Sequence, residues 1–181
     1  MKKFLKLIFK ISFLFIISIN CNADVITKIN IEGNNRVSDE TIKLYGKIKL
    51  NKDISDQEQN NILNNLNSTN FFEDIKINQS NGVLNIFVVE YPVVNQLVIS
   101  GEPSSKIKNE IKKRITTKAK RSFIKSSISN DIDLIKKLYS SIGYNFVNVD
   151  VKTKQLDETN FDILIDIKRG EVTKISSISF V

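Results

Sequence analysis

The chain has 181 residues, of which 41% are hydrophobic and 26% are charged. This composition is typical of a folded globular protein and excludes a disordered chain, and the length allows one ordinary domain or two small ones. The sequence contains no histidine and one cysteine, Cys21, which excludes Ser-His-Asp or Cys-His catalysis and the usual zinc sites. A glycine-rich phosphate loop is also absent. We therefore expect no catalytic residue, no metal and no cofactor, and a protein that is not an enzyme.

The formal net charge of +7 is distributed unevenly along the chain. Residues 24–92 hold 7 basic and 10 acidic groups, whereas residues 93–181 hold 16 basic and 10 acidic groups. The basic excess of the folded part therefore belongs to the second half.

The first 23 residues have the pattern of a secretory signal peptide. Lys2 and Lys3 precede an apolar run over 11–19, and small residues at Cys21 and Ala23 suit a cleavage site. The apolar run is shorter than the roughly 20 residues that span a bilayer. We expect cleavage after Ala23 and export to the periplasm; an uncleaved anchor, or a lipoprotein acylated on Cys21, is the alternative.

A strand-like segment recurs along the chain. Ile26–Gly33 reappears as Asn95–Gly101 and in part as Ser177–Val181, and Ile31 and Ile99 occupy matching positions 68 residues apart. Recurrence in a fixed order predicts small modules in series.

The first copy is followed by two helical and two strand-like patterns. Ser38 is a candidate N-cap for a short helix that we expect to run to about residue 45, with Gly46 ending it. Ser55–Glu58 fits a capping box at the start of a second helix. Strand-like runs over 71–79 and 83–90 are joined by an Asn-Gly dipeptide, which is a strong hairpin signal.

The second copy repeats this order. A strand over 95–100 is followed by a helix that carries isoleucines four residues apart over 107–115, and by an amphipathic helix over 128–142. Alternating apolar residues over 147–152 and 161–168 predict a pair of strands.

The order β-α-α-β-β occurs twice, which predicts an α+β fold of tandem modules, each with two helices packed on a three-stranded sheet. We place the signal peptide at 1–23, module 1 at 24–92, module 2 at 93–173 and the first strand of an incomplete third module at 174–181.

Several conspicuous side chains fit structural roles. Phe71, Phe72 and Phe146 are expected in the cores. The adjacent carboxylates of Glu73–Asp74 and Asp157–Glu158 would point to opposite faces of a strand, so we expect surface or turn roles rather than glycosidase chemistry.

The sheet edges are candidate binding sites for an extended peptide. A three-stranded sheet has two edges with unpaired backbone groups, and the second strand of each module is expected at one of them. The candidate partner-binding residues are Ile75, Lys76, Ile77, Asn78, Val149, Asp150, Val151 and Lys152. Alternatively, the charges among them protect an edge that binds nothing.

The segment Lys106–Lys125 holds nine basic residues and one acid, Glu110. It is either a face for an anionic partner or the solvated side of a helix. The candidate residues are Lys108, Lys112, Lys113, Arg114, Lys118, Lys120 and Arg121. Nucleic acid is not expected as the partner, because the chain is exported and Phe123 is the only aromatic residue of the segment.

Five stretches in this order resemble polypeptide-transport-associated (POTRA) domains. They are INIEGNNRVSDETI (29–42), NFFEDIKI (70–77), VVEYPVVNQLVISG (88–101), LYSSIGYNFVNVDV (138–151) and KRGEVTKISSISFV (168–181).

The resemblance implies a non-enzymatic periplasmic scaffold that serves the assembly of β-barrel proteins in the outer membrane. It also implies unfolded outer-membrane proteins and accessory lipoproteins as partners, with clients bound partly by strand addition. The membrane barrel of that family is not in this sequence, and the glycine expected after Val181 is missing, so we expect an incomplete chain. The alternatives are the POTRA region of a two-partner secretion transporter and a stand-alone periplasmic adaptor for an anionic partner.

Overall fold

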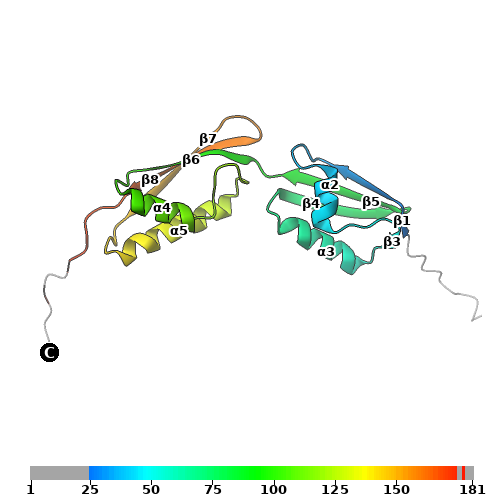
Figure 1. The fold of residues 1–181 in the computed structure, drawn as a ribbon, viewed down its shortest axis with the longest axis horizontal. Coiled ribbons are helices and arrows are strands. Elements are labelled where there is room, and N and C mark those ends of the chain that lie inside the picture. Colours follow the sequence, from blue (N-terminus) through cyan, green and yellow to red (C-terminus); the bar gives the residue numbers. More distant parts are fainter. Residues whose placement is uncertain (1–24, 175–176, 178–181) are drawn as a thin grey trace, which may run out of the picture.

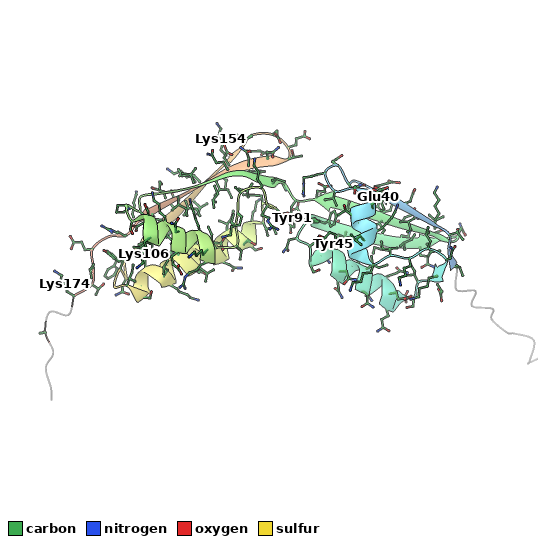
Figure 2. The ribbon with its side chains drawn as sticks, viewed as in Figure 1. Glu40, Tyr45, Tyr91, Lys106, Lys154 and Lys174 are labelled. Carbon is green, nitrogen blue, oxygen red and sulfur yellow. The ribbon has the colours of Figure 1, made fainter. Side chains whose placement is uncertain are left out.

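The computed structural model describes residues 25–174 and residue 177. These residues form two successive modules, each a three-stranded sheet with two helices on one side (Figure 1). Tyr91 lies between the modules (Figure 2). The sequence-based prediction of an α+β fold with tandem β-α-α-β-β modules is confirmed. No helix in this part of the chain is long and apolar enough to cross a membrane.

In module 1 the sheet has the order β2-β5-β4, with β2 parallel and β4 antiparallel to the central strand. Its elements are β2 (Lys28–Glu32), α2 (Asp39–Gly46), α3 (Asp56–Asn67), β4 (Phe72–Ser80) and β5 (Val83–Glu90). An additional pair, β1 (Val25–Ile26) and β3 (Lys52–Asp53), lies beside them.

Local sequence signals explain where these elements begin and turn. The Ser38 hydroxyl accepts a hydrogen bond from the Thr41 amide at the start of α2. Ser55 and Glu58 form the predicted capping box at the start of α3. Asn81 and Gly82 both have positive φ, 51° and 72°, which is the geometry that a tight two-residue hairpin requires.

Module 2 repeats this architecture with the sheet order β6-β8-β7. Its elements are β6 (Val93–Ser100), α4 (Ser105–Arg114), α5 (Lys125–Ser141), β7 (Asn148–Gln155) and β8 (Asn160–Lys168). β6 runs parallel to β8, and β7 runs antiparallel to it.

Each module has its own hydrophobic core between the sheet and the helices. In module 1, Leu84, Ile86 and Val88 of β5 pack against residues such as Ile62 and Leu66 of α3. The core of module 2 consists of Val94, Ile99, Ile111, Ile115, Phe123, Ile135, Tyr139, Val149, Ile163, Ile165 and Ile167. Alternate residues of each central strand face its core, as the period-two pattern predicted.

Each module has the same close backbone contact within it, at the turn that follows β2 in module 1 and β6 in module 2. Gly33 has φ +88°, and a Cβ there would lie 2.1 Å from the carbonyl oxygen of Val88. At Gly101, φ is +79° and a Cβ would lie 2.0 Å from the carbonyl oxygen of Ile167. Only glycine fits such a position, so the sequence repeat extends to this structural detail.

The predicted end of α2 at Gly46 is confirmed, but the left-handed conformation that commonly follows a helix belongs to Lys47, at φ 55°. Gly46 is buried, and a Cβ there would lie 2.9 Å from Ile48 Cγ1, so tight packing explains its small side chain. The expectation for Phe146 was wrong. Phe146 is 81% exposed rather than in the core. It is out of phase with Val147 and Val149, which face the core.

The predictions for the two ends lie outside the described residues, except at Lys174 and Ser177. These are the signal peptide with its cleavage after Ala23, and the strand assigned to 174–181. Lys174 and Ser177 are described and belong to no helix or strand.

Candidate functional site: free sheet edges and the module junction

The sheet order leaves β4 and β7 at sheet edges, together with the first strands β2 and β6. The start of β6 is covered by its own module. The Val94 amide donates to Arg121 O at 2.8 Å, the Lys120 amide donates to Val94 O at 2.6 Å, and the Phe123 amide donates to Pro92 O at 2.7 Å. Across the described residues no comparable backbone bonds cover the outer edge of β4 or β7. These two strands therefore keep unpaired backbone groups.

The edge of β4 contains the first four predicted residues. Ile75 and Ile77 are half-buried and pack on the core of module 1, whereas Lys76 and Asn78 are exposed. Lys76 Nζ lies 3.3 Å from Asp74 Oδ2 on the solvent face of the sheet. On the same face, Phe87 of β5 lies opposite Lys76 and is 43% exposed. A strand added to the edge of β4 would lie near the exposed ring of Phe87 and the charged side chains of Lys76 and Asp74.

The edge of β7 contains the other four predicted residues. Val149 is buried, Val151 packs partly on the core of module 2, and Asp150 and Lys152 are exposed. The strand is eight residues long, and its side chains on the solvent face make no hydrogen bond or ion pair in the described region. The two predicted sets lie in different sheets, so the structure offers two separate edges.

A shallow hollow of about 360 Å³ lies on the solvent face of the second sheet, next to β7. Val98 of β6 and Leu164 of β8 form its apolar part, and Lys152 and Lys154 of β7 form its rim. Figure 2 shows Lys154 on the side of the sheet away from α4 and α5. A strand added to β7 would have an apolar surface nearby for one of its faces.

The seven predicted cations have different surroundings. Lys108, Lys112, Lys113 and Arg114 belong to α4, where Arg114 Nε donates to Glu110 Oε1 at 2.8 Å. Lys120 Nζ donates to Asn95 Oδ1 at 2.9 Å. Lys118 and Arg121 instead line a hollow at the junction with module 1. Only part of the basic segment thus lies on the surface of a helix.

Two of the buried polar side chains, Tyr139 and Glu102, are bonded to each other. The Tyr139 hydroxyl donates to Glu102, whose other oxygen accepts from the Ser104 amide at 2.7 Å. Burial, and then the hydrogen bond to Glu102, raises the pKa of Tyr139 above its ordinary value. This pair joins α5 to the turn before α4. The described part of the chain holds no group of three acidic, histidine or cysteine side chains that could bind a metal.

One of the suspected carboxylate pairs has a turn role. The Asp157 carboxylate accepts from the Thr159 amide at 2.7 Å and from the Asn160 side chain at 3.0 Å. The hydrogen bond from the Thr159 amide is the largest of the interactions that lower the pKa of Asp157. Asp157 therefore shapes the hairpin between β7 and β8.

Sequence reasoning missed the residues from module 1 that meet the basic segment. Arg36 lines the same junction hollow as Lys118 and Arg121, although about 80 residues separate it from them. Its guanidinium lies 5.8 Å from the centroid of the Phe71 ring. No motif marks Arg36, and only the folded chain brings it to the basic segment.

A family model matches the second module. Residues 92–170 match the family described as "POTRA: Surface antigen variable number repeat". Module 2 is therefore similar to POTRA domains over this range. This match covers the whole of module 2, from β6 to β8.

Two relatives match most of the chain, and both are described as "Outer membrane protein assembly factor BamA". The protein of Neorickettsia risticii is 25% identical over 167 residues, which is 92% of this chain and 22% of the relative. The protein of Neisseria meningitidis serogroup B is 27% identical over 159 residues, which is 86% of this chain and 20% of the relative. The chain thus spans about a fifth of the length of these relatives.

A solved structure extends the likeness in fold to both modules. The N-terminal domain of Omp85 from the thermophilic cyanobacterium Thermosynechococcus elongatus matches with a TM-score of 0.51 and 17% identity. The match covers 85% of this chain and 72% of that one. The fold of the two modules is therefore similar to that of this Omp85 N-terminal domain.

Proposed function

We propose that this chain is the non-enzymatic periplasmic scaffold of an outer-membrane β-barrel assembly factor. It would receive unfolded outer-membrane proteins and accessory lipoproteins, and it would bind clients partly by strand addition. The similarity to BamA proteins over most of the chain supports the assembly role. The proposed location is the periplasmic side of the outer membrane, after export by the signal peptide and its removal behind Ala23.

The free edge of β7 is the observation that carries the binding part of this proposal. An extended segment can use the backbone donors and acceptors of β7 whatever its own sequence, which suits a scaffold that receives many clients. The rival edge, β6, is already bonded at its start by residues 120–123. The edge of β4 is a second candidate, with the salt bridge between Lys76 and Asp74 on its solvent face.

Site-specific crosslinking tests this proposal. A photoreactive residue replaces Lys152, on the solvent face of β7, or Lys136, an exposed lysine on α5 that serves as the control. A urea-unfolded outer-membrane barrel protein is then diluted into the purified chain. We expect a much higher yield at position 152, and a yield that persists from low to physiological ionic strength because backbone bonds are screened little.

Equal yields at the two positions would contradict strand addition. A yield at position 152 that disappears at physiological salt would favour an adaptor that binds an anionic partner by charge. Comparable crosslinking to a folded soluble protein would contradict a preference for unfolded clients.

A further inference from the structure

A polar hollow of about 320 Å³ lies where the two modules meet. Module 1 contributes Arg36 and the segment 69–71, and module 2 contributes residues around 116–127. The lining side chains include three cations and several hydroxyl groups, and none of them is acidic. This composition is that of a site for an anion.

Three cations reach the hollow from two directions. Arg36 comes from the turn before α2, and Lys118 and Arg121 come from the segment between α4 and α5. Arg121 forms no salt bridge with any described residue, and Lys118 Nζ donates to the backbone carbonyl of Lys112. Both of these side chains keep their charge uncompensated.

A buried hydroxyl in the same lining lacks a partner. Thr117 is 5% exposed, and within the described residues its Oγ1 forms no hydrogen bond. A buried hydroxyl without a partner costs stability, and a ligand that accepts a hydrogen bond from it would remove that cost. The Thr117 backbone is already used, because its amide donates to Asp131 Oδ2 at 2.8 Å.

The start of α5 adds a third kind of donor. This helix has 17 residues, its N-cap residue is Ile124, and no side chain caps it. The first amides of a helix have no partner within the helix and carry a partial positive charge. Ile124 and Ser127 both line the hollow, so the first turn of α5 borders it.

Two carboxylates lie near this hollow without lining it. Asp131 is buried and accepts from the Thr116 amide at 2.6 Å, the Thr116 hydroxyl at 3.0 Å and the Thr117 amide at 2.8 Å. Glu90 Oε2 lies 3.4 Å from Arg36 Nε, and its other oxygen accepts from the backbone amides of residues 35, 36 and 37. Each carboxylate already accepts hydrogen bonds from its own donors. The three cations outnumber the two carboxylates, so the net charge around the hollow is positive.

We propose that this junction hollow binds a phosphoryl group, either as free inorganic phosphate or as the phosphate of a lipid headgroup. A tetrahedral oxyanion can accept from the Arg36 and Arg121 guanidinium groups, the Lys118 ammonium, the Thr117 hydroxyl and the first amides of α5. A bound phosphate would connect the modules, because Arg36 belongs to one and the other donors to the next. This inference does not depend on strand addition at β7.

The test compares three forms of the full chain with the wild type. Arg121→Gln removes an unpaired cation, and Thr117→Val removes the unpartnered hydroxyl with little change in volume. Arg114→Gln is the matched control, because it makes the same change on α4 at a residue that pairs with Glu110. Each form is titrated calorimetrically with inorganic phosphate, and its melting temperature is measured with and without phosphate.

We expect saturable phosphate binding by the wild type, weakened about tenfold or more by Arg121→Gln and unchanged by Arg114→Gln. Thr117→Val should melt at a higher temperature than the wild type without phosphate and gain less from phosphate, because the unpartnered hydroxyl is gone. A merely destabilising substitution would not produce this combination.

Sedimentation with phosphatidylglycerol vesicles distinguishes the two sources of the phosphate. Vesicle binding that is lost in Arg121→Gln and kept in Arg114→Gln supports a lipid headgroup, even if free phosphate binds weakly. Two results would overturn the proposal. One is that neither phosphate nor vesicles bind in a way that depends on Arg121. The other is equal loss in Arg114→Gln, which would indicate general charge attraction only.

Discussion

The backbone contact at Gly101 allows a sharp test of the packing of module 2. In Gly101→Ala, the new Cβ would lie 2.0 Å from the Ile167 carbonyl oxygen, at a backbone φ of +79°. Positive φ costs an alanine about 1–2 kcal/mol. The contact must also open by about 1.4 Å to reach 3.4 Å, the short end of ordinary van der Waals contact, which displaces β6 from β8. We expect a total loss of about 3 kcal/mol or more.

Gly170→Ala is the matched control. Gly170 also has positive φ, +68°, but the nearest atom to its Cβ, the Phe146 carbonyl oxygen, lies 3.5 Å away. Only the cost of positive φ, about 1 kcal/mol, should remain. For a domain of this size, about 1 kcal/mol corresponds to about 4–8 °C in melting temperature, so the two variants should differ by at least about 8 °C.

Backbone amide resonances followed through a urea titration measure the loss for each module separately. Gly101→Ala should unfold module 2 early and leave the midpoint of module 1 nearly unchanged, while Gly33→Ala should do the reverse. A Gly101→Ala variant as stable as Gly170→Ala would refute the close approach of Gly101 to Ile167. A loss shared equally by both modules would refute the separate cores.

Four further predictions concern single side chains. Val149→Asp and Ile165→Asp each put a charge on the core face of module 2, so each should cost more than about 3 kcal/mol; an unchanged urea midpoint would contradict the strand assignment. Glu90→Gln weakens the acceptor of three amides and removes an ion pair, so the free energy of unfolding of module 1, measured by urea denaturation, should fall by about 1–2 kcal/mol. An unchanged free energy would show that these contacts are absent in solution. Ser55→Ala should cost about 1 kcal/mol by removing the capping box. The hydrogen bond from Lys52 lowers the pKa of Glu58. In amide hydrogen exchange, the amides at the start of α3 should therefore lose their protection from exchange only as the pH falls below the ordinary carboxyl range. Loss of this protection near neutral pH would contradict the prediction.

Local signals were enough to predict most of the fold. The capping box at Ser55, the Asn81–Gly82 turn and the alternation over 161–168 each depend on neighbours within a few residues, so sequence alone locates them. The packing around Gly46 and the exposure of Phe146 were not predicted. The Ile48 and Ile62 side chains determine the space at Gly46, and a phase difference of one residue turns Phe146 toward solvent.

The candidate sites could be predicted only in part. The position of β4 and β7 at sheet edges follows from the order of elements, but the bonds that cover the start of β6 come from residues 120–123, in a segment without a periodic pattern. The junction hollow depends on the placement of Arg36 against Arg121. Sequence spacing carries no signal for a contact between two modules.

Amide hydrogen exchange of the full chain, with and without an unfolded outer-membrane barrel protein, tests strand addition most directly. We predict that the client slows exchange in β7 (Asn148–Gln155), because the free donors of that edge become bonded. The start of β6 should change little, because residues 120–123 already bond to it. Protection confined to α4 and α5, or no change in β7 while the client is bound, would contradict the account.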